Sequence, residues 1–241
     1  MTDYVLSDDT RAIFKRISTA SIATQLFKRG LRNQFIQGVS PVSPKEENMV
    51  GQAFTLRYIP AREDRNPLEV FRNPDHPQRV AVETCPPGHV LVMDARKDAR
   101  AATAGSILIT RMAVRGCAGV VSDGGFRDAH GIGKLDMPAY CAKPSAPTNL
   151  TLHEALDINV PIACGDVAVF PGDVIVGDRD GVMVIPAHLA EEIAEVCSGM
   201  ESFEDFVLEQ VAAGESIIGL YPCTRDENQK KYEEWRTKTG R

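Results

Sequence analysis

The chain has 241 residues, of which 43% are hydrophobic and 25% charged, a composition typical of a globular protein. That length suffices for one large domain with extensions. The net charge is −6 and the lysines and arginines are scattered, which excludes an extended nucleic-acid-binding surface. The N-terminus has no apolar signal sequence and no segment approaches the length of a membrane span, so we expect a cytoplasmic protein with neither nucleic acid nor membrane as partner.

The N-terminal segment is predicted to be helical over residues 8–30. Ser18 or Thr19 is suited to cap a second short helix that ends at Gly30. Residues 31–50 are expected to form a connection that carries an extended segment.

A strand is predicted over 51–60, followed by a polar, proline-containing segment over 61–79. We expect this segment to be a long loop, and long loops in compact domains are often functional. Arg57, Arg62 and Arg72 in or near it are candidates for binding a distal carboxylate of a substrate.

The centre of the chain alternates apolar runs with one helical pattern. Residues 89–95 and 118–125 have the continuous apolar character of buried strands, and 137–142 resemble a third. Between the first two, residues 101–116 have helical spacing and end at Gly116. This order predicts a βαβ unit and a partly parallel sheet.

The last part begins with short strands over 158–164, 167–178 and 181–186, separated by turn sequences, which predict a β-meander or a small barrel-like sheet. A long amphipathic helix is predicted over 187–214, and the charged tail over 224–241 is expected to dock as a short helix or to fray. The predicted class is α/β, with a partly parallel central sheet and helical N- and C-terminal extensions.

Six cysteines are present, none at the CxxC spacing of metal or redox sites. Most have apolar neighbours, so we predict buried, reduced thiols.

The sequence Ser122–His130 (SDGGFRDAH) contains the strongest candidate site. A loop at the carboxyl end of a parallel strand is where α/β folds bind ligands. Arg127 offers a planar fork for a carboxylate, and Asp128 offers a hard oxygen ligand for a cation. A solvated surface pair is the alternative interpretation of these two residues.

Gly105, Ser106, Ile107 and Leu108 lie at the start of the predicted central helix. Free N–H groups at a helix start attract an anion such as a carboxylate or enolate. An ordinary helix start packed on the sheet is the alternative.

Residues 90–128 and 160–186 together resemble the RraA-like family, and the resemblance covers roughly residues 18–190. Its most specific parts are Gly105, the sequence Asp123-Gly124 followed by Arg127-Asp128, and the turns over 171–182. The family includes 4-hydroxy-4-methyl-2-oxoglutarate/4-carboxy-4-hydroxy-2-oxoadipate aldolases and regulators of ribonuclease E, and older names for members refer to demethylmenaquinone methyltransferase.

The resemblance implies a single domain over 1–241 with a swivelling β/β/α fold, a core at about 18–190 and a C-terminal helical extension over 187–241. It also implies a homotrimer or a dimer of trimers, with active sites between subunits.

The resemblance also assigns roles to the site. Asp128 would bind Mg²⁺ or Mn²⁺, largely through waters, and Arg127 would hold the pyruvyl carboxylate and stabilise the enolate. Gly105 and the backbone N–H groups of residues 106–108 would contact the pyruvate end. The implied function is a divalent-metal-dependent lyase, an aldolase or oxaloacetate decarboxylase, that acts on a small 2-oxo acid.

Two positions depart from the aldolase pattern, because Ser106 and Gly131 stand where aldolases of this family tend to have acidic residues. His130 is a candidate to take over proton transfer. Asp123 is a candidate for contacting the ligands of the metal without binding the metal itself.

Two other functions remain open at this stage. One is a non-catalytic regulator that binds an RNA-decay protein. The other is a dehydratase or hydratase of sugar-derived 2-oxo acids that uses the same site. A methyltransferase is not supported, because no glycine-rich cofactor loop follows the first strand.

Overall fold

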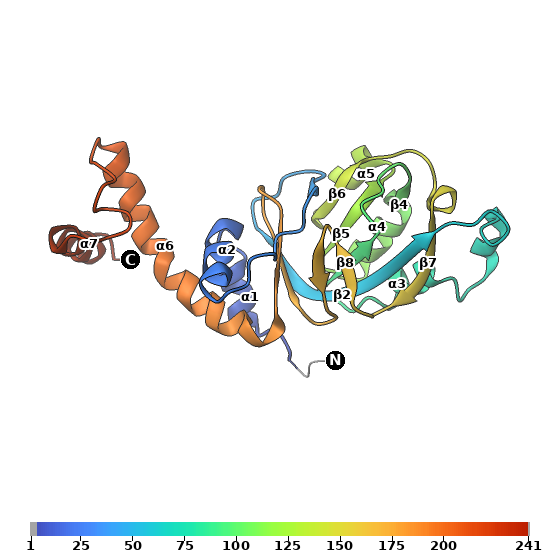
Figure 1. Cartoon of the computed structure of the whole chain (residues 1–241), viewed down its shortest axis with the longest axis horizontal. Helices are drawn as coiled ribbons and strands as arrows, with labels where there is room; N and C mark the ends of the chain where they lie inside the picture. Colours follow the sequence, from blue (N-terminus) through green and yellow to red (C-terminus); the bar gives the residue numbers. More distant parts are fainter. Residues whose placement is uncertain (1–3, 241) are drawn as a thin grey trace.

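The computed structural model describes residues 4–240, and within this range nine strands form one mixed sheet (Figure 1). Its order is β1-β6-β5-β3-β2-β10-β11, with β4 also paired to β5 and β7 to β2. Strands β8 and β9 form a separate antiparallel hairpin. The strands are β1 (Ser40–Pro41), β2 (Met49–Pro60), β3 (His89–Asp94), β4 (Ala102–Ala104), β5 (Gly119–Phe126), β6 (Ala139–Pro144), β7 (His153–Ile158), β8 (Ile162–Cys164), β9 (Val167–Val169), β10 (Val174–Gly177) and β11 (Val182–Ile185).

The helices cover the sheet and extend the chain at both ends. The α-helices are α1 (Asp8–Phe14), α2 (Thr19–Lys28), α3 (Pro77–Thr84), α4 (Ser106–Val114), α5 (Ala129–Gly133), α6 (Ala190–Ala212) and α7 (Asp226–Thr239), and the 3₁₀ turns are η1 (Leu68–Arg72), η2 (Asn149–Thr151) and η3 (Ala187–Leu189). None of the described helices is both long and apolar enough to cross a membrane.

The parallel centre of the sheet consists of β2, β3, β5 and β6. Every residue of β5 is buried, as expected for a strand covered on both faces. Helix α4 links β3 to β5, and α5 links β5 to β6. The predicted α/β class with a partly parallel sheet is therefore confirmed.

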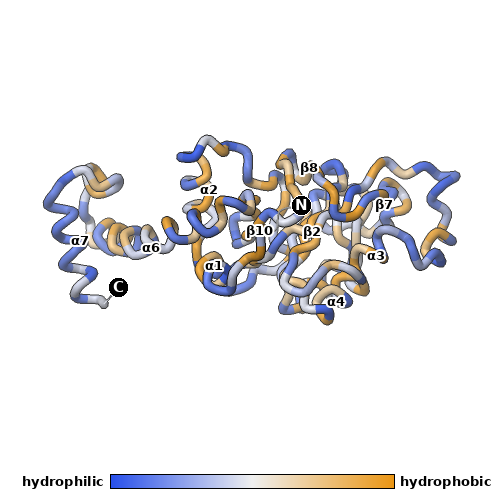
Figure 2. Tube along the Cα trace, turned by 90° about the horizontal axis from the view of Figure 1, so that it is seen from below, coloured by the Kyte–Doolittle hydropathy of each residue, from blue (hydrophilic) through white to orange (hydrophobic). Residues whose placement is uncertain are grey.

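The sheet has two distinct packing faces. One face packs against α3 and α4 in a buried cluster that includes Leu91, Met93 and Ile109. The other packs against the β8–β9 hairpin, where Val92 and Val167 share a second cluster. The hydropathy-coloured trace shows apolar segments in the strands and in α6, whereas α7 is mostly hydrophilic (Figure 2).

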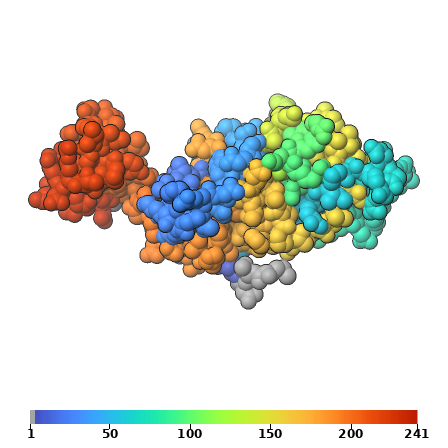
Figure 3. Space-filling view, viewed as in Figure 1, coloured from blue at the N-terminus to red at the C-terminus, as the bar shows by residue number. Residues whose placement is uncertain are grey.

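Helices α1, α2 and the first half of α6 cover the sheet beside β10 and β11. Of the two predicted capping residues, Ser18 caps α2, because its hydroxyl accepts from the N–H of Ser21 at 3.1 Å, and Thr19 is the first residue of the helix. Helix α6 then projects away from the body, and its far end packs with α7 around Phe206, Leu220 and Trp235 (Figures 1 and 3). The 14 residues of α7 show that most of the charged tail is helical.

The predicted helix over 101–116 was wrong at its start. Residues Ala102–Ala104 form β4, which pairs in parallel with the end of β5, and the helix begins only at Ser106. The hydroxyl of Thr103 lies 2.9 Å from the hydroxyl of Ser122 and donates to the carbonyl of Gly125 at 3.1 Å. Alanine favours helices, but this non-local pairing outweighs local propensity.

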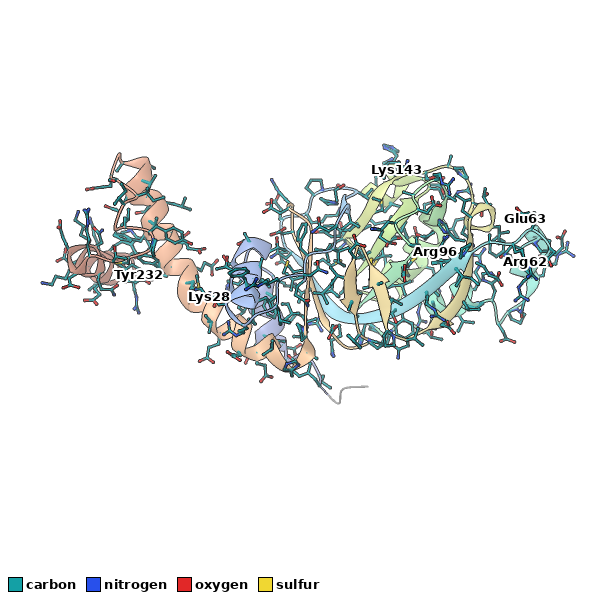
Figure 4. The ribbon with its side chains drawn as sticks, in the orientation of Figure 1. Lys28, Arg62, Glu63, Arg96, Lys143 and Tyr232 are labelled. Carbon is teal, nitrogen blue, oxygen red and sulfur yellow. The ribbon has the colours of Figure 1, made fainter. Side chains whose placement is uncertain are left out.

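The predicted loop over 61–79 was also wrong at its end, since Pro77 is the first residue of α3. Proline is favoured at this position because its missing N–H would have no helical partner. The rest of the segment includes the 3₁₀ turn η1 and projects from the body at the end opposite α6, where Arg62 and Glu63 lie (Figure 4).

The sequence also did not reveal β7, which pairs with the second half of β2, or α5. All six cysteines are described and free, and only Cys223 is not buried, in agreement with the prediction of buried thiols.

His153 at the start of β7 makes the fold sensitive to acid. Its ring is buried, and Nδ1 accepts from the guanidinium of Arg96 at 3.1 Å, so the imidazole is neutral. Burial, followed by the positive charge of Arg96, lowers the pKa of His153 below its usual value. The unfolded chain therefore takes up a proton below pH of about 6.5 that the folded chain does not.

We predict that the free energy of unfolding falls between pH of about 7 and about 5, and falls less in His153→Phe. The free energy of unfolding of His153→Phe still depends on pH, because burial also lowers the pKa of His76. Urea denaturation at several pH values measures this pH dependence, and His130→Phe, at an exposed histidine, is the control. Identical slopes in wild type and His153→Phe would contradict this explanation.

Candidate active site

Two turns at the carboxyl edge of the parallel strands bring the predicted residues together. One is the β4–α4 turn at Gly105, and the other is the β5–α5 turn at Arg127 and Asp128. The backbone N–H of Arg127 donates to the carbonyl of Ala104 at 3.0 Å, which extends the pairing between β4 and β5. The strand that the sequence did not reveal therefore positions the site.

Gly105 allows this close approach. A Cβ atom at this position would lie 2.7 Å from Cγ of Arg127 and 3.2 Å from Oδ2 of Asp128. The φ angle of Gly105 is −128°, which any residue adopts. Space, rather than backbone conformation, therefore requires glycine here.

Asp128 is held by its neighbours through one carboxylate oxygen. Oδ2 accepts from the hydroxyl of Ser106 at 3.2 Å and from its N–H at 3.4 Å, and Nε of Arg127 lies 3.7 Å away. The residue itself has a left-handed backbone with φ 60°, a conformation that aspartate tolerates better than most residues. No hydrogen bond from the described residues reaches Oδ1, which leaves it available to a ligand.

The first turn of α4 presents unsatisfied donors beside this carboxylate. Intrahelical bonding begins where the N–H of Ile109 donates to the carbonyl of Gly105 at 3.2 Å. The N–H groups of Ile107 and Leu108 find no acceptor within the part of the chain that the structure describes. They carry the partial positive charge of a helix start and suit an anion.

A cavity of about 220 Å³ opens on these groups. Gly105, Ile107, Leu108, Arg127 and Asp128 form one wall. The rest of the lining includes Phe71, Gln78 and Arg79 from the segment over 61–79 that we expected to be functional, together with Thr148 and Asn149, which we had not placed at the site. The polar, proline-containing character of the segment over 61–79 was the sequence signal for this part of the lining, and Pro77 marks the start of α3 within it.

Gln78 is a fixed part of that wall. Its amide donates to the carbonyl of Thr103 at 2.6 Å, so α3 is bonded directly to the strand that precedes Gly105. The buried hydroxyl of Tyr58 donates to the same carbonyl at 3.0 Å, and burial raises the pKa of Tyr58, so this phenol is protonated.

Asp123 does not join the cluster. Its buried carboxylate accepts from the backbone N–H groups of Ala95, Lys97 and Gly165 at 2.6, 3.0 and 3.1 Å. These bonds connect the end of β5 to two neighbouring loops. Burial raises the pKa of Asp123, and the three N–H donors oppose that rise.

The remaining candidates lie at the edge of the site or outside it. His130 is exposed on α5 and is not in the cavity wall. A Cβ at Gly131 would lie 3.5 Å from Cβ of Ser106, so the two positions where acids were expected face each other. Among the arginines proposed for a distal carboxylate, Arg57 pairs with Asp157 and Arg62 with Asp64.

The donor set fits a divalent cation that keeps most of its waters. Within residues 4–240 no group of three or more histidine, cysteine, aspartate or glutamate side chains converges on a metal site. Mg²⁺ commonly takes only one or two carboxylates and completes its octahedron with waters and substrate oxygens. The half-exposed Asp128, with Oδ1 available, can serve as that single carboxylate.

Comparison with known proteins identifies the family of this chain. The model of the RraA-like family, described as aldolase/RraA, matches residues 19–184. The chain belongs to the RraA-like family. The match includes both turns of the site and ends before α6, so the projecting C-terminal helices lie outside it.

The relatives of this chain include one protein named as an aldolase and one described as a member of an RNase inhibitor family. A protein of Halalkalibacterium halodurans named "Putative 4-hydroxy-4-methyl-2-oxoglutarate aldolase" is 34% identical over 76% of this chain and 79% of its own length. The structure of RraAS2 from Streptomyces coelicolor, an unusual member of the RNase ES inhibitor RraA protein family, has a TM-score of 0.73 at 28% identity, covering 83% of this chain and 96% of that one. An uncharacterized protein from Pseudomonas syringae shares the fold, with a TM-score of 0.74 at 21% identity over 90% and 98% of the two chains.

The contacts of Asp123 predict a structural role that can be separated from ligand binding. In Asp123→Asn an amide NH₂ must face at least one of the three backbone donors, which leaves that N–H unsatisfied. We predict a loss of about 2–4 kcal/mol in the free energy of unfolding. The affinity of the folded protein for Mn²⁺ should not change.

Chemical denaturation and calorimetric titration with Mn²⁺ measure the two quantities. Asp166→Asn is the matched control, because Asp166 pairs with Lys97 on the surface at 2.7 Å and should contribute little. Weaker Mn²⁺ binding by Asp123→Asn at unchanged stability would instead indicate that Asp123 supports the metal.

Proposed function

We propose that this RraA-like protein is a divalent-metal-dependent lyase that releases pyruvate from a small 2-oxo acid. The observation that carries the proposal is the convergence of Arg127, Asp128 and the free N–H groups of α4 on one cavity. The family membership and the aldolase name of a relative support the same reaction class.

Each group has a separate task in binding the pyruvyl end. Arg127 pairs its guanidinium with the carboxylate of the 2-oxo acid. The N–H groups of Ile107 and Leu108 stabilise negative charge on the substrate, an interaction that strengthens as charge develops on the keto oxygen. Mg²⁺ or Mn²⁺ bound at Asp128 would supply Lewis acidity at that oxygen.

Proton transfer distinguishes the possible reactions at this site. In retro-aldol cleavage the C3–C4 bond breaks, the C4 hydroxyl loses its proton, and the bond's electron pair is delocalised into the keto group until C3 is protonated. In decarboxylation of oxaloacetate carbon dioxide leaves instead, and no hydroxyl proton needs to be removed. Among the described residues that line the cavity, Asp128 is the only acid.

Ser106 therefore changes the balance between the two reactions. Its hydroxyl donates to Asp128 and fixes the carboxylate, whereas an acid at this position could accept a proton. We infer that oxaloacetate decarboxylation is less affected by this replacement than retro-aldol cleavage of 4-hydroxy-4-methyl-2-oxoglutarate.

Pyruvate release from both substrates tests the proposal, with the pyruvate reduced by lactate dehydrogenase in the presence of Mg²⁺ or a chelator. We predict turnover that the chelator abolishes and that Asp128→Asn and Arg127→Met each lower by about 100–1000-fold. Asp136→Asn, an exposed acid on the loop after α5, should retain wild-type turnover. Turnover that survives both the chelator and Asp128→Asn would rule out the proposed mechanism.

A further inference from the structure

We propose that Arg79 is a specificity-determining residue that binds a second anionic group of the substrate, separate from the carboxylate that Arg127 holds. The inference rests on the proposed function only in taking the Arg127 end of the cavity as the pyruvyl end. It assigns a role to the cavity residues of α3 and η1, which take no part in the proposed lyase mechanism.

Arg79 is held in place by an aromatic ring rather than by an acid. Its guanidinium carbon lies 4.6 Å from the ring centre of Phe71, and the ring of His76 packs edge-on against Phe71 with centroids 5.1 Å apart. Stacking of this kind orients the planar fork while leaving its N–H donors free for a ligand.

No carboxylate of the described residues forms an ion pair with Arg79. Neighbouring arginines are paired, since Arg65 contacts Glu154 at 3.1 Å and Arg111 contacts Glu83 at 2.9 Å. Arg79 is partly buried in the cavity wall, where an unpaired charge costs more than on an open surface. An anionic ligand would supply the missing counter-charge.

The charge balance of the cavity agrees with such a ligand. Arg79 and Arg127 are cations and Asp128 is the only anion among the described residues of the wall, which leaves one net positive charge. A divalent cation at Asp128 would raise this to three. A ligand with one carboxylate cannot neutralise that charge, whereas a ligand with a second anionic group reduces it further.

The size of the cavity suits a small ligand. Its volume of about 220 Å³ lies below the range of about 300–1000 Å³ typical of drug-sized ligands. The class that fits is a short 2-oxo acid with a second carboxylate, in which Arg127 binds the carboxylate next to the keto group and Arg79 binds the other.

A matched pair of probes tests the role of Arg79 without turnover. 2-Oxoglutarate and 2-oxovalerate have the same chain length and differ in the distal carboxylate. With Mg²⁺ present, calorimetric titration of the full chain should show tighter binding of 2-oxoglutarate. Arg79→Met should weaken 2-oxoglutarate binding by about 10–100-fold and leave 2-oxovalerate binding unchanged.

Two further variants test whether Arg79 recognises the distal carboxylate or only stabilises the folded protein. Arg79→Lys keeps the charge without the planar fork and should restore part of the preference for 2-oxoglutarate. Arg72→Met is the control, because Arg72 is exposed on η1 and outside the cavity wall.

The outcomes distinguish this inference from the proposed function. A preference for 2-oxoglutarate that depends on Arg79 supports the inference even in a protein that releases no pyruvate. Equal weakening of both probes by Arg79→Met, no weakening of 2-oxoglutarate binding, or failure of both probes to bind the wild type would each overturn it, whatever the turnover assay shows.

Discussion

The close contact between Gly105 and the Arg127–Asp128 turn determines the rest of the site. A Cβ at Gly105 would lie 2.7 Å from Cγ of Arg127, so the Arg127 side chain takes its present position because this residue has no Cβ. The contact brings the free N–H groups of α4 and the carboxylate of Asp128 to one cavity wall. Strand β4 maintains it through its pairing with β5, and Gln78 connects it to α3.

The site is built from fixed parts around a carboxylate with one available oxygen. Ser106 and Arg127 hold Oδ2 of Asp128, and Oδ1 has no partner among the described residues. Fixing the ligand in advance reduces the entropy lost when a cation and a 2-oxo acid bind. The serine that replaces an acid in the aldolase pattern thus keeps a positioning role while it removes a possible base, which narrows the chemistry expected at this site.

The sequence predicted the parts of the fold that depend on local pattern. Strands β3 and β5 were visible because strands buried on both faces are continuous apolar runs, and Ser18 was recognised as a cap from its position before α2. Strand β4 was not visible, because its alanine-rich sequence favours a helix and only the distant end of β5 makes it a strand. Arg127, Asp128 and Gly105 could be proposed from one motif and a family resemblance. The presence of Arg79 in the same cavity depends on how α3 packs against α4, and no local pattern specifies that packing.

A crystal structure with Mg²⁺ and oxalate, a planar mimic of the enolate of pyruvate, tests the central claim most directly. The account predicts a cation bound to Oδ1 of Asp128. It also predicts one oxalate carboxylate within hydrogen-bonding distance of the Arg127 guanidinium and the N–H groups of Ile107 and Leu108. A saturated crystal in which the cation and oxalate bind elsewhere, with Asp128 contacting neither directly nor through a water, would contradict it.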